Sequence, residues 1–227
     1  MRPWCVAAVA ACALASTAWA GTDTPSATLP SESPPSQARI DTAFIEQPWP
    51  RQLVRELEVG RYPVRWRQHA SHADGLFAGV RFTAPLAQQR VWDLANDYHD
   101  IGTMTPGVTS VRFLEQTPTR QVIQVDVKVL WKSLRLTFEV EQVPPQAVRF
   151  RLVNKLLGEY RGVCLFEEQP PAANGRPATA VALSTWLKPA RPVPIGLLMT
   201  VERVILLKGV REFLATCESP PATPPHS

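Results

Sequence analysis

Apolar and polar residues alternate over a long central part of the chain, which is the pattern of strands that bury one face. Apolar side chains occupy every second position there, and charged or amide side chains lie between them. The alternating segments are residues 121–131, 133–143 and 147–153. This alternation predicts an antiparallel sheet with one solvated face, and Pro144-Pro145 predicts the turn between the last two strands.

Further strands are expected on both sides of this region, because shorter segments repeat the alternation. These segments are residues 61–69, 76–83, 108–114, 159–167 and 179–187. Residues 53–60, with the sequence LVRELEVG, fit a helical turn as well as a strand, so both assignments stay open.

Two segments change to the helical period of 3.6 residues. In residues 86–98, apolar residues from Val91 to Ala95 fall near helical spacing. Residues 195–216 predict one long helix with a broad apolar face, which indicates burial on more than one side. This helix carries too many charged residues to span a membrane. The order of strand, helix, several antiparallel strands and long helix predicts an α+β fold.

The two ends of the chain differ from this core. Residues 1–20 have the features of a secretory signal peptide: an early arginine, an uncharged apolar stretch and an Ala-Trp-Ala ending. A membrane anchor and, through Cys12, a lipoprotein signal are the alternatives, but the apolar stretch is short for either. Residues 21–50 and 218–227 are rich in proline and predict a mobile linker and a mobile tail. We therefore expect a periplasmic or secreted protein with a folded domain at 51–217.

Composition and charge limit the partners. The chain of 227 residues is 45% hydrophobic, enough for a sizeable core, and its net charge of +4 is too mild to demand nucleic acid. Arg61, Arg65 and Arg67 alternate with aromatic residues, and we expect them to form the solvated face of a strand. Transient membrane contact stays open, and the oligomeric state stays undetermined. Cys164 and Cys217 remain after signal cleavage, and could form a disulfide or be two buried thiols.

Few residues offer catalytic chemistry. The chain contains no metal-binding, nucleotide-binding or nucleophile motif, so no metal site and no cofactor is predicted. The densest cluster of ionisable side chains is Asp97, His99 and Asp100, at the end of the first expected helix. A histidine held by a carboxylate can relay a proton near neutral pH. We favour a polar helix end for this cluster and keep catalysis as the weaker alternative.

Several short motifs occur in a characteristic order. Ala84-Pro85 precedes a VWDLANDY helix, a TPGV turn follows, Gly158 and Gly162 form a G-x-x-x-G pair, and prolines lead into the terminal helix. Over residues 59–217 this order resembles the START-like polyketide cyclase and coenzyme-Q-binding (SRPBCC) superfamily. The resemblance implies a helix-grip fold, in which a curved antiparallel sheet wraps around the long C-terminal helix and leaves an internal apolar cavity. Its usual task is to bind a lipid, quinone, polyketide or steroid-like molecule.

We therefore expect an exported binding or carrier protein for a hydrophobic small molecule. The expected lining of its cavity is Trp131, Leu136, Phe138, Phe150, Leu152, Met199 and Val210. The helical projection also places Arg203 in the middle of an apolar face, where it must find an acid, reach water, or bind an acidic group of the ligand. A cyclase, dehydratase or hydrolase on the same fold stays open, as does an envelope interaction module without a ligand.

Overall fold

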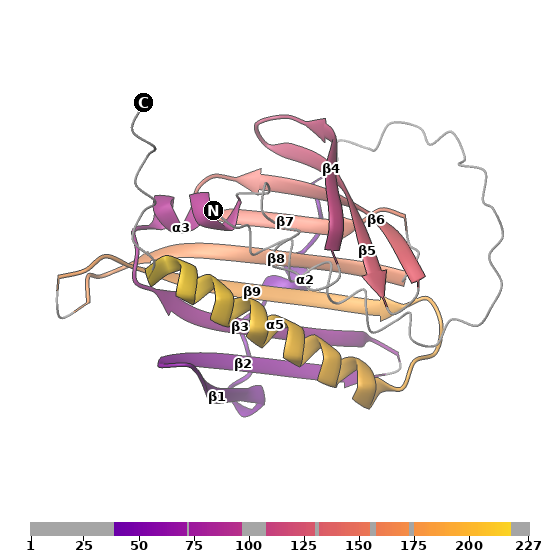
Figure 1. Cartoon of the computed structure of the whole chain (residues 1–227). Coiled ribbons are helices and arrows are strands. Elements are labelled where there is room, and N and C mark those ends of the chain that lie inside the picture. The colour runs from indigo at the N-terminus through magenta and orange to yellow at the C-terminus, as the bar shows by residue number, and fades with distance from the viewer. Residues whose placement is uncertain are drawn as a thin grey trace.

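One antiparallel sheet dominates the structure, with the strand order β1-β2-β3-β9-β8-β7-β6-β5-β4 (Figure 1). The computed structural model describes residues 39–71, 73–96, 108–129, 132–154, 158–172 and 175–218. Within these residues the nine strands are Val54–Val59 (β1), Tyr62–Ser71 (β2), Gly75–Ala84 (β3), Val108–Gln116 (β4), Arg120–Val129 (β5), Lys132–Val143 (β6), Ala147–Leu152 (β7), Gly158–Gln169 (β8) and Ala178–Pro189 (β9). The antiparallel sheet that the alternation predicts is confirmed, and the ambiguous segment 53–60 contains strand β1.

The last strand joins two parts of the sheet that are distant in the sequence. Strand β9 pairs with β3 on one side and with β8 on the other. Each further pairing along the sheet is a hairpin between consecutive strands. The predicted turn at Pro144 and Pro145 connects β6 and β7.

The C-terminal helix α5 (Ile195–Glu218) crosses one face of the sheet obliquely (Figure 1), and this face is called the helix face. Helix α5 packs on β3, β2 and β1. The ring of Phe213 meets Phe82 of β3 at a centroid distance of 6.0 Å, and Gln68 of β2 donates a hydrogen bond to the Met199 carbonyl at 2.8 Å. None of the helices in the described ranges combines the length and hydropathy that a membrane crossing requires.

Helix α3 (Gln88–Ala95) packs beside β8, β9 and α5. Its buried residues are Val91, Trp92, Leu94 and Ala95, as the helical spacing predicts. The Trp92 ring meets Phe166 of β8 edge-on, with centroids 5.5 Å apart. Phe166 lies opposite Val181 of β9, which lies opposite Phe82 of β3, the residue that contacts α5. This contact therefore places α3 on the helix face.

The opposite face of the sheet is crossed by residues 39–53, which are called the strap. The strap contains α2 (Ala43–Glu46) and the short helix η1 (Arg51–Leu53). Ile40 is 2% exposed and Ile45 is 0% exposed. This part of the segment expected to be a mobile linker is therefore packed, and the domain boundary expected at 51 lies too late in the chain.

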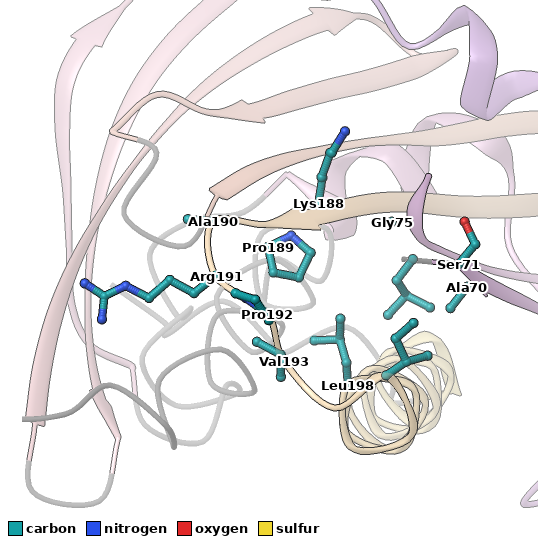
Figure 2. Close-up of a pocket in the computed structure, with 12 residues that line it drawn as sticks. Ala70, Ser71, Gly75, Lys188, Pro189, Ala190, Arg191, Pro192, Val193 and Leu198 are labelled. Atoms are coloured by element: carbon teal, nitrogen blue, oxygen red, sulfur yellow. The ribbon is translucent and has the colours of Figure 1, made fainter. Parts of the chain in front are cut away.

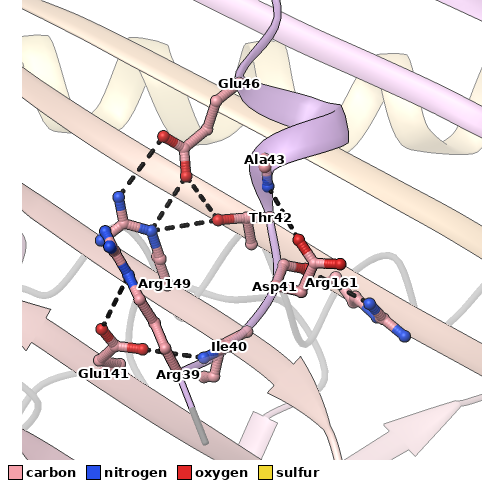
Figure 3. Close-up of polar contacts among 9 residues, drawn as sticks. All are labelled: Arg39, Ile40, Asp41, Thr42, Ala43, Glu46, Glu141, Arg149 and Arg161. Carbon is pink, nitrogen blue, oxygen red and sulfur yellow. Dashed lines mark hydrogen bonds and ion pairs between the residues drawn. The ribbon is translucent and has the colours of Figure 1, made fainter.

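Polar contacts fix the strap to the middle strands of the sheet (Figure 3). Arg149 of β7 donates through Nε to Thr42 Oγ1 at 3.1 Å and to Glu46 Oε1 at 3.0 Å. The Ile40 amide donates to Glu141 Oε2 of β6 at 2.9 Å. These contacts tie the strap to the neighbouring strands β6 and β7, which lie inside the sheet and not at its edge.

Candidate functional site

A pocket of about 370 Å³ opens where the β2–β3 hairpin, the end of β9 and the first turn of α5 meet (Figure 2). Its lining residues are Ala70, Ser71, Gly75, Leu76, Lys188, Pro189, Ala190, Arg191, Pro192, Val193, Ile195 and Leu198. Leu76 and Leu198 are almost fully buried, so they form the inner wall. The side chains of Lys188 and Arg191 extend away from the other lining residues (Figure 2). The pocket is therefore apolar inside, with cationic groups near its edge.

The local sequence explains why space remains here. Residues 189–194 contain three prolines, which cannot donate to the sheet ladder and which end β9 before α5 begins. The connection carries the chain from the sheet to the start of α5, where the Pro194 carbonyl accepts the first amide bonds of the helix. Across the pocket, Gly75 has a φ of 83°, a conformation that favours glycine, and its position beside the Leu187 carbonyl leaves no room for a side chain.

An apolar row leads from the pocket along the helix face. Leu76 of β3 lies opposite Leu187 of β9, which lies opposite Tyr160 of β8. The Tyr160 ring is 5.9 Å from the ring of Phe150 on β7. All four of these side chains are buried. The row connects the pocket with the strands that the sequence predicts to line a ligand.

The G-x-x-x-G pair has a packing role beside this row. Gly162 lies under the Phe150 ring, and a Cβ atom at this position would collide with it. Gly158 has a φ of 109° and lies against the backbone of residues 188–190. Both glycines therefore allow close packing, next to the Phe150 ring and next to the end of β9.

Most of the predicted lining residues lie together on the helix face. Leu136, Phe138, Phe150, Leu152 and Val210 are buried, and Met199 is half-buried. Phe138 lies opposite Leu152 in the β6–β7 ladder. None of these residues lines the described pocket, and Trp131 lies outside the described residues. Their contact with a ligand, and a closed cavity between the sheet and α5, stay predictions.

The placement of Arg203 on the buried face of the helix is wrong. Arg203 is exposed, whereas its neighbour Glu202 is 1% exposed. The buried stripe follows Leu198, Glu202, Leu206 and Val210 at intervals of four residues. Arg203 follows this stripe by one residue, which turns its side chain about 100° away around the helix.

Glu202 is a polar group that the sequence analysis missed. Its Oε1 accepts a hydrogen bond of 2.7 Å from the Thr185 hydroxyl on β9. It lies one helical turn beyond Leu198, which lines the pocket. Its spacing of four residues from both Leu198 and Leu206 could have placed it on the same buried side of the helix. Glu202 is therefore a buried carboxyl group on the helix face, near the inner wall of the pocket.

The other residues considered for catalysis, metal binding or a disulfide lie away from the pocket or outside the described residues. Asp97, His99 and Asp100 lie outside the described residues. In the ranges that are described, no group of three or more His, Cys, Asp and Glu residues could hold a metal ion. Cys164 and Cys217 are buried and form no disulfide with each other, and burial raises the pKa of Cys217 to about 12. A thiol with this pKa is a poor nucleophile at neutral pH.

Known structures share this architecture. A STAR-related lipid transfer protein from Xanthomonas axonopodis matches with a TM-score of 0.53 and 13% identity, over 74% of this chain and 99% of its own. The Zhui aromatase/cyclase from Streptomyces sp. R1128 matches with a TM-score of 0.50 and 16% identity, over 63% of this chain and 93% of its own. A comparison with curated proteins gave no match.

The long terminal helix across a curved antiparallel sheet defines the helix-grip class of α+β proteins, as the resemblance implied. Within this class, residues 84–214 match the family described as polyketide cyclase / dehydrase and lipid transport. The chain belongs to this family, since the match covers more than half of its length.

Proposed function

We propose that this protein binds and carries a hydrophobic small molecule, such as a lipid, a quinone or a polyketide-like compound. The observation that supports this most is the apolar pocket at the start of α5, which continues into the buried row of Leu187, Tyr160 and Phe150. Its volume of about 370 Å³ falls within the range of small-molecule sites, about 300–1,000 Å³. The family description includes lipid transport, which is compatible with this proposal.

The proposal is tested by filling the pocket. Ile195 lines the pocket and is half-buried, so Ile195→Trp reduces the space at its mouth. Val204 lies on the same helix and is 60% exposed, so Val204→Trp is the matched control. Uptake of the neutral fluorophore N-phenyl-1-naphthylamine is measured for each variant, and urea unfolding confirms that both are folded.

We expect Ile195→Trp to weaken fluorophore uptake tenfold or more and Val204→Trp to leave it unchanged. Equal uptake by the Ile195→Trp variant and the wild type contradicts the role of the pocket. An absence of uptake by the folded wild-type protein favours an interaction module without a ligand.

An enzyme on the same fold is the second candidate, because Glu202 places a carboxyl group near the inner wall of the pocket. A carboxyl group acts as a general acid or base within hydrogen-bond reach of the substrate or through one water, so this role requires a substrate that extends past Leu198 to Glu202. Its test is Glu202→Gln, assayed with a substrate that the wild-type protein converts. Loss of turnover with unchanged fluorophore affinity supports catalysis, whereas unchanged turnover contradicts this role of Glu202. The cluster of Asp97, His99 and Asp100 stays a separate prediction.

We further propose that the protein is exported, with cleavage after residue 20. The support is the sequence of the first 20 residues, with their arginine, apolar stretch and Ala-Trp-Ala ending. The intact mass of protein recovered from the periplasm or the medium tests this. A mass that begins at Gly21 supports export, and a protein that is recovered from the cytoplasm with residues 1–20 retained contradicts it.

A further inference from the structure

An aromatic ring in contact with two arginines lies on the strap face, on the other side of the sheet from the pocket. Trp49 of the strap packs over Gly79 of β3, where a side chain at Gly79 would collide with the indole ring. The guanidinium carbon of Arg67 is 4.8 Å from the centre of the ring, and that of Arg81 is 4.6 Å from it. The strap thus brings a tryptophan from outside the sheet onto two arginines of neighbouring strands.

Positive charge accumulates at this place. Arg65 lies directly opposite Arg81 in the β2–β3 ladder, and like charges in this position destabilise a sheet. Arg65 pairs with Glu56 at 3.4 Å. In the described part of the chain no carboxylate lies within 4.0 Å of the Arg67 or Arg81 guanidinium groups, although Glu167 acts on Arg81 from farther away. Among the described residues, the guanidinium groups of Arg67 and Arg81 therefore have no close counterion.

Arg67 is the most constrained of these arginines. It is only 8% exposed, and its buried Nε has no hydrogen-bond acceptor in the described residues. Burial lowers the pKa of Arg67, and the charge of Arg81 lowers it further. The face of Trp49 attracts the cation but does not replace the oxygen acceptors that a guanidinium fork prefers. Arg81 is exposed, so this side of the cluster is open to solvent.

We propose that Arg67 and Arg81, held by Trp49, form a binding site for a phosphate-type dianion on the strap face. Two guanidinium groups with no carboxylate within 4.0 Å among the described residues match the two negative charges of such an anion. A carboxylate offers two oxygens and is used up by one guanidinium fork, whereas a phosphate group has enough oxygens to accept hydrogen bonds from two forks. The site is independent of the proposed function, because it lies on the opposite face from the pocket and shares none of its lining residues.

The experiment titrates the full-length protein with inorganic phosphate at constant ionic strength, with chloride as the balancing anion. Binding is measured by calorimetry and by the rise in the melting temperature, since a ligand that binds only the folded state stabilises it. The test variant is Arg81→Gln, because Arg81 is exposed and its replacement leaves the core intact. The control is Arg211→Gln, which removes one exposed positive charge from α5 on the other face.

We expect saturable phosphate binding that Arg81→Gln weakens tenfold or more and Arg211→Gln leaves unchanged. A second variant, Arg67→Lys, keeps the charge but removes the fork, and we expect it to weaken binding as well. Equal loss in the Arg81→Gln and Arg211→Gln variants shows a general charge effect and overturns the proposal.

A second arm separates a free anion from a lipid headgroup. It measures binding to phosphatidylcholine vesicles with and without phosphatidic acid. Binding of inorganic phosphate that depends on Arg81 supports a site for a free anion. Binding only to the vesicles with phosphatidic acid, lost in the Arg81→Gln variant, supports a headgroup site. Binding in neither arm overturns the proposal, and this outcome leaves the apolar pocket and its fluorophore test untouched.

Discussion

Replacing Ile45 by alanine tests whether the strap is an integral part of the folded domain. Ile45 lies in α2, within a segment whose composition predicts a mobile linker, yet its side chain is 0% exposed. If the strap does not fold cooperatively with the sheet, removing this side chain changes the free energy of unfolding of the domain little. If the strap folds together with the sheet, the loss of buried surface destabilises the whole domain.

The expected magnitude follows from the buried groups. Ile45→Ala removes three carbon atoms from a fully buried side chain, which at about 0.8 kcal/mol each amounts to about 2.4 kcal/mol of lost transfer free energy. An unfilled cavity adds to this, and buried Ile→Ala changes cost about 2–5 kcal/mol. The strap lies at the surface and can partly collapse into the space. We therefore expect a loss of about 2–3 kcal/mol in the free energy of unfolding.

Urea unfolding, followed by circular dichroism, measures this loss. Gln47→Ala is the control, because Gln47 directly follows α2 and is exposed, and its change is expected to stay within about 0.5 kcal/mol. A single transition with a lowered midpoint and an unchanged slope supports the integral strap. A change in the Ile45→Ala variant as small as that of the control refutes it.

Three further predictions concern Glu46, Gly162 and Cys217. Burial raises the pKa of Glu46, but the hydrogen bonds from Arg149 and Thr42 and the charges of Arg149 and Arg39 together outweigh burial and keep the pKa below 4.5. The contribution of Glu46 to stability is therefore present above pH 4.5 and lost as pH falls through the folded-state pKa, and Glu46→Gln should flatten the stability curve there. Gly162→Ala should cost about 1–3 kcal/mol in urea unfolding, because the methyl group meets the Phe150 ring; an unchanged midpoint contradicts this packing. Cys217 should resist a thiol reagent at pH 8 in the native protein and react in urea; rapid native modification contradicts its burial.

The sheet and the terminal helix could be predicted from the sequence because their signals are periodic and repeated. The alternation in β5, β6 and β7 continues over many residues, so an isolated exception does not change the assignment. The strap could not be predicted in this way. Its burial depends on a few side chains, such as Ile40 and Ile45, within a segment rich in small and polar residues, and on partners that are distant in the sequence.

The site was predicted less well, for two physical reasons. The pocket is formed by residues of the β2–β3 hairpin, β9 and α5, which only the folded topology brings together. The orientation of α5 was off by about one residue, because a broad apolar face does not define its own centre. This error exchanged Arg203 for Glu202. Likewise, Arg67 was expected on a solvated strand face, and it is buried because Trp49 of the strap covers it.

Native mass spectrometry of the purified full-length protein shows directly whether it binds a hydrophobic small molecule. We expect a non-covalent adduct of one small molecule per chain, which organic solvent extracts and which N-phenyl-1-naphthylamine displaces. In the Ile195→Trp variant the adduct should be reduced, and in the Val204→Trp variant it should be retained. A folded wild-type protein that carries no adduct and takes up no displaceable fluorophore is not a carrier of a hydrophobic small molecule.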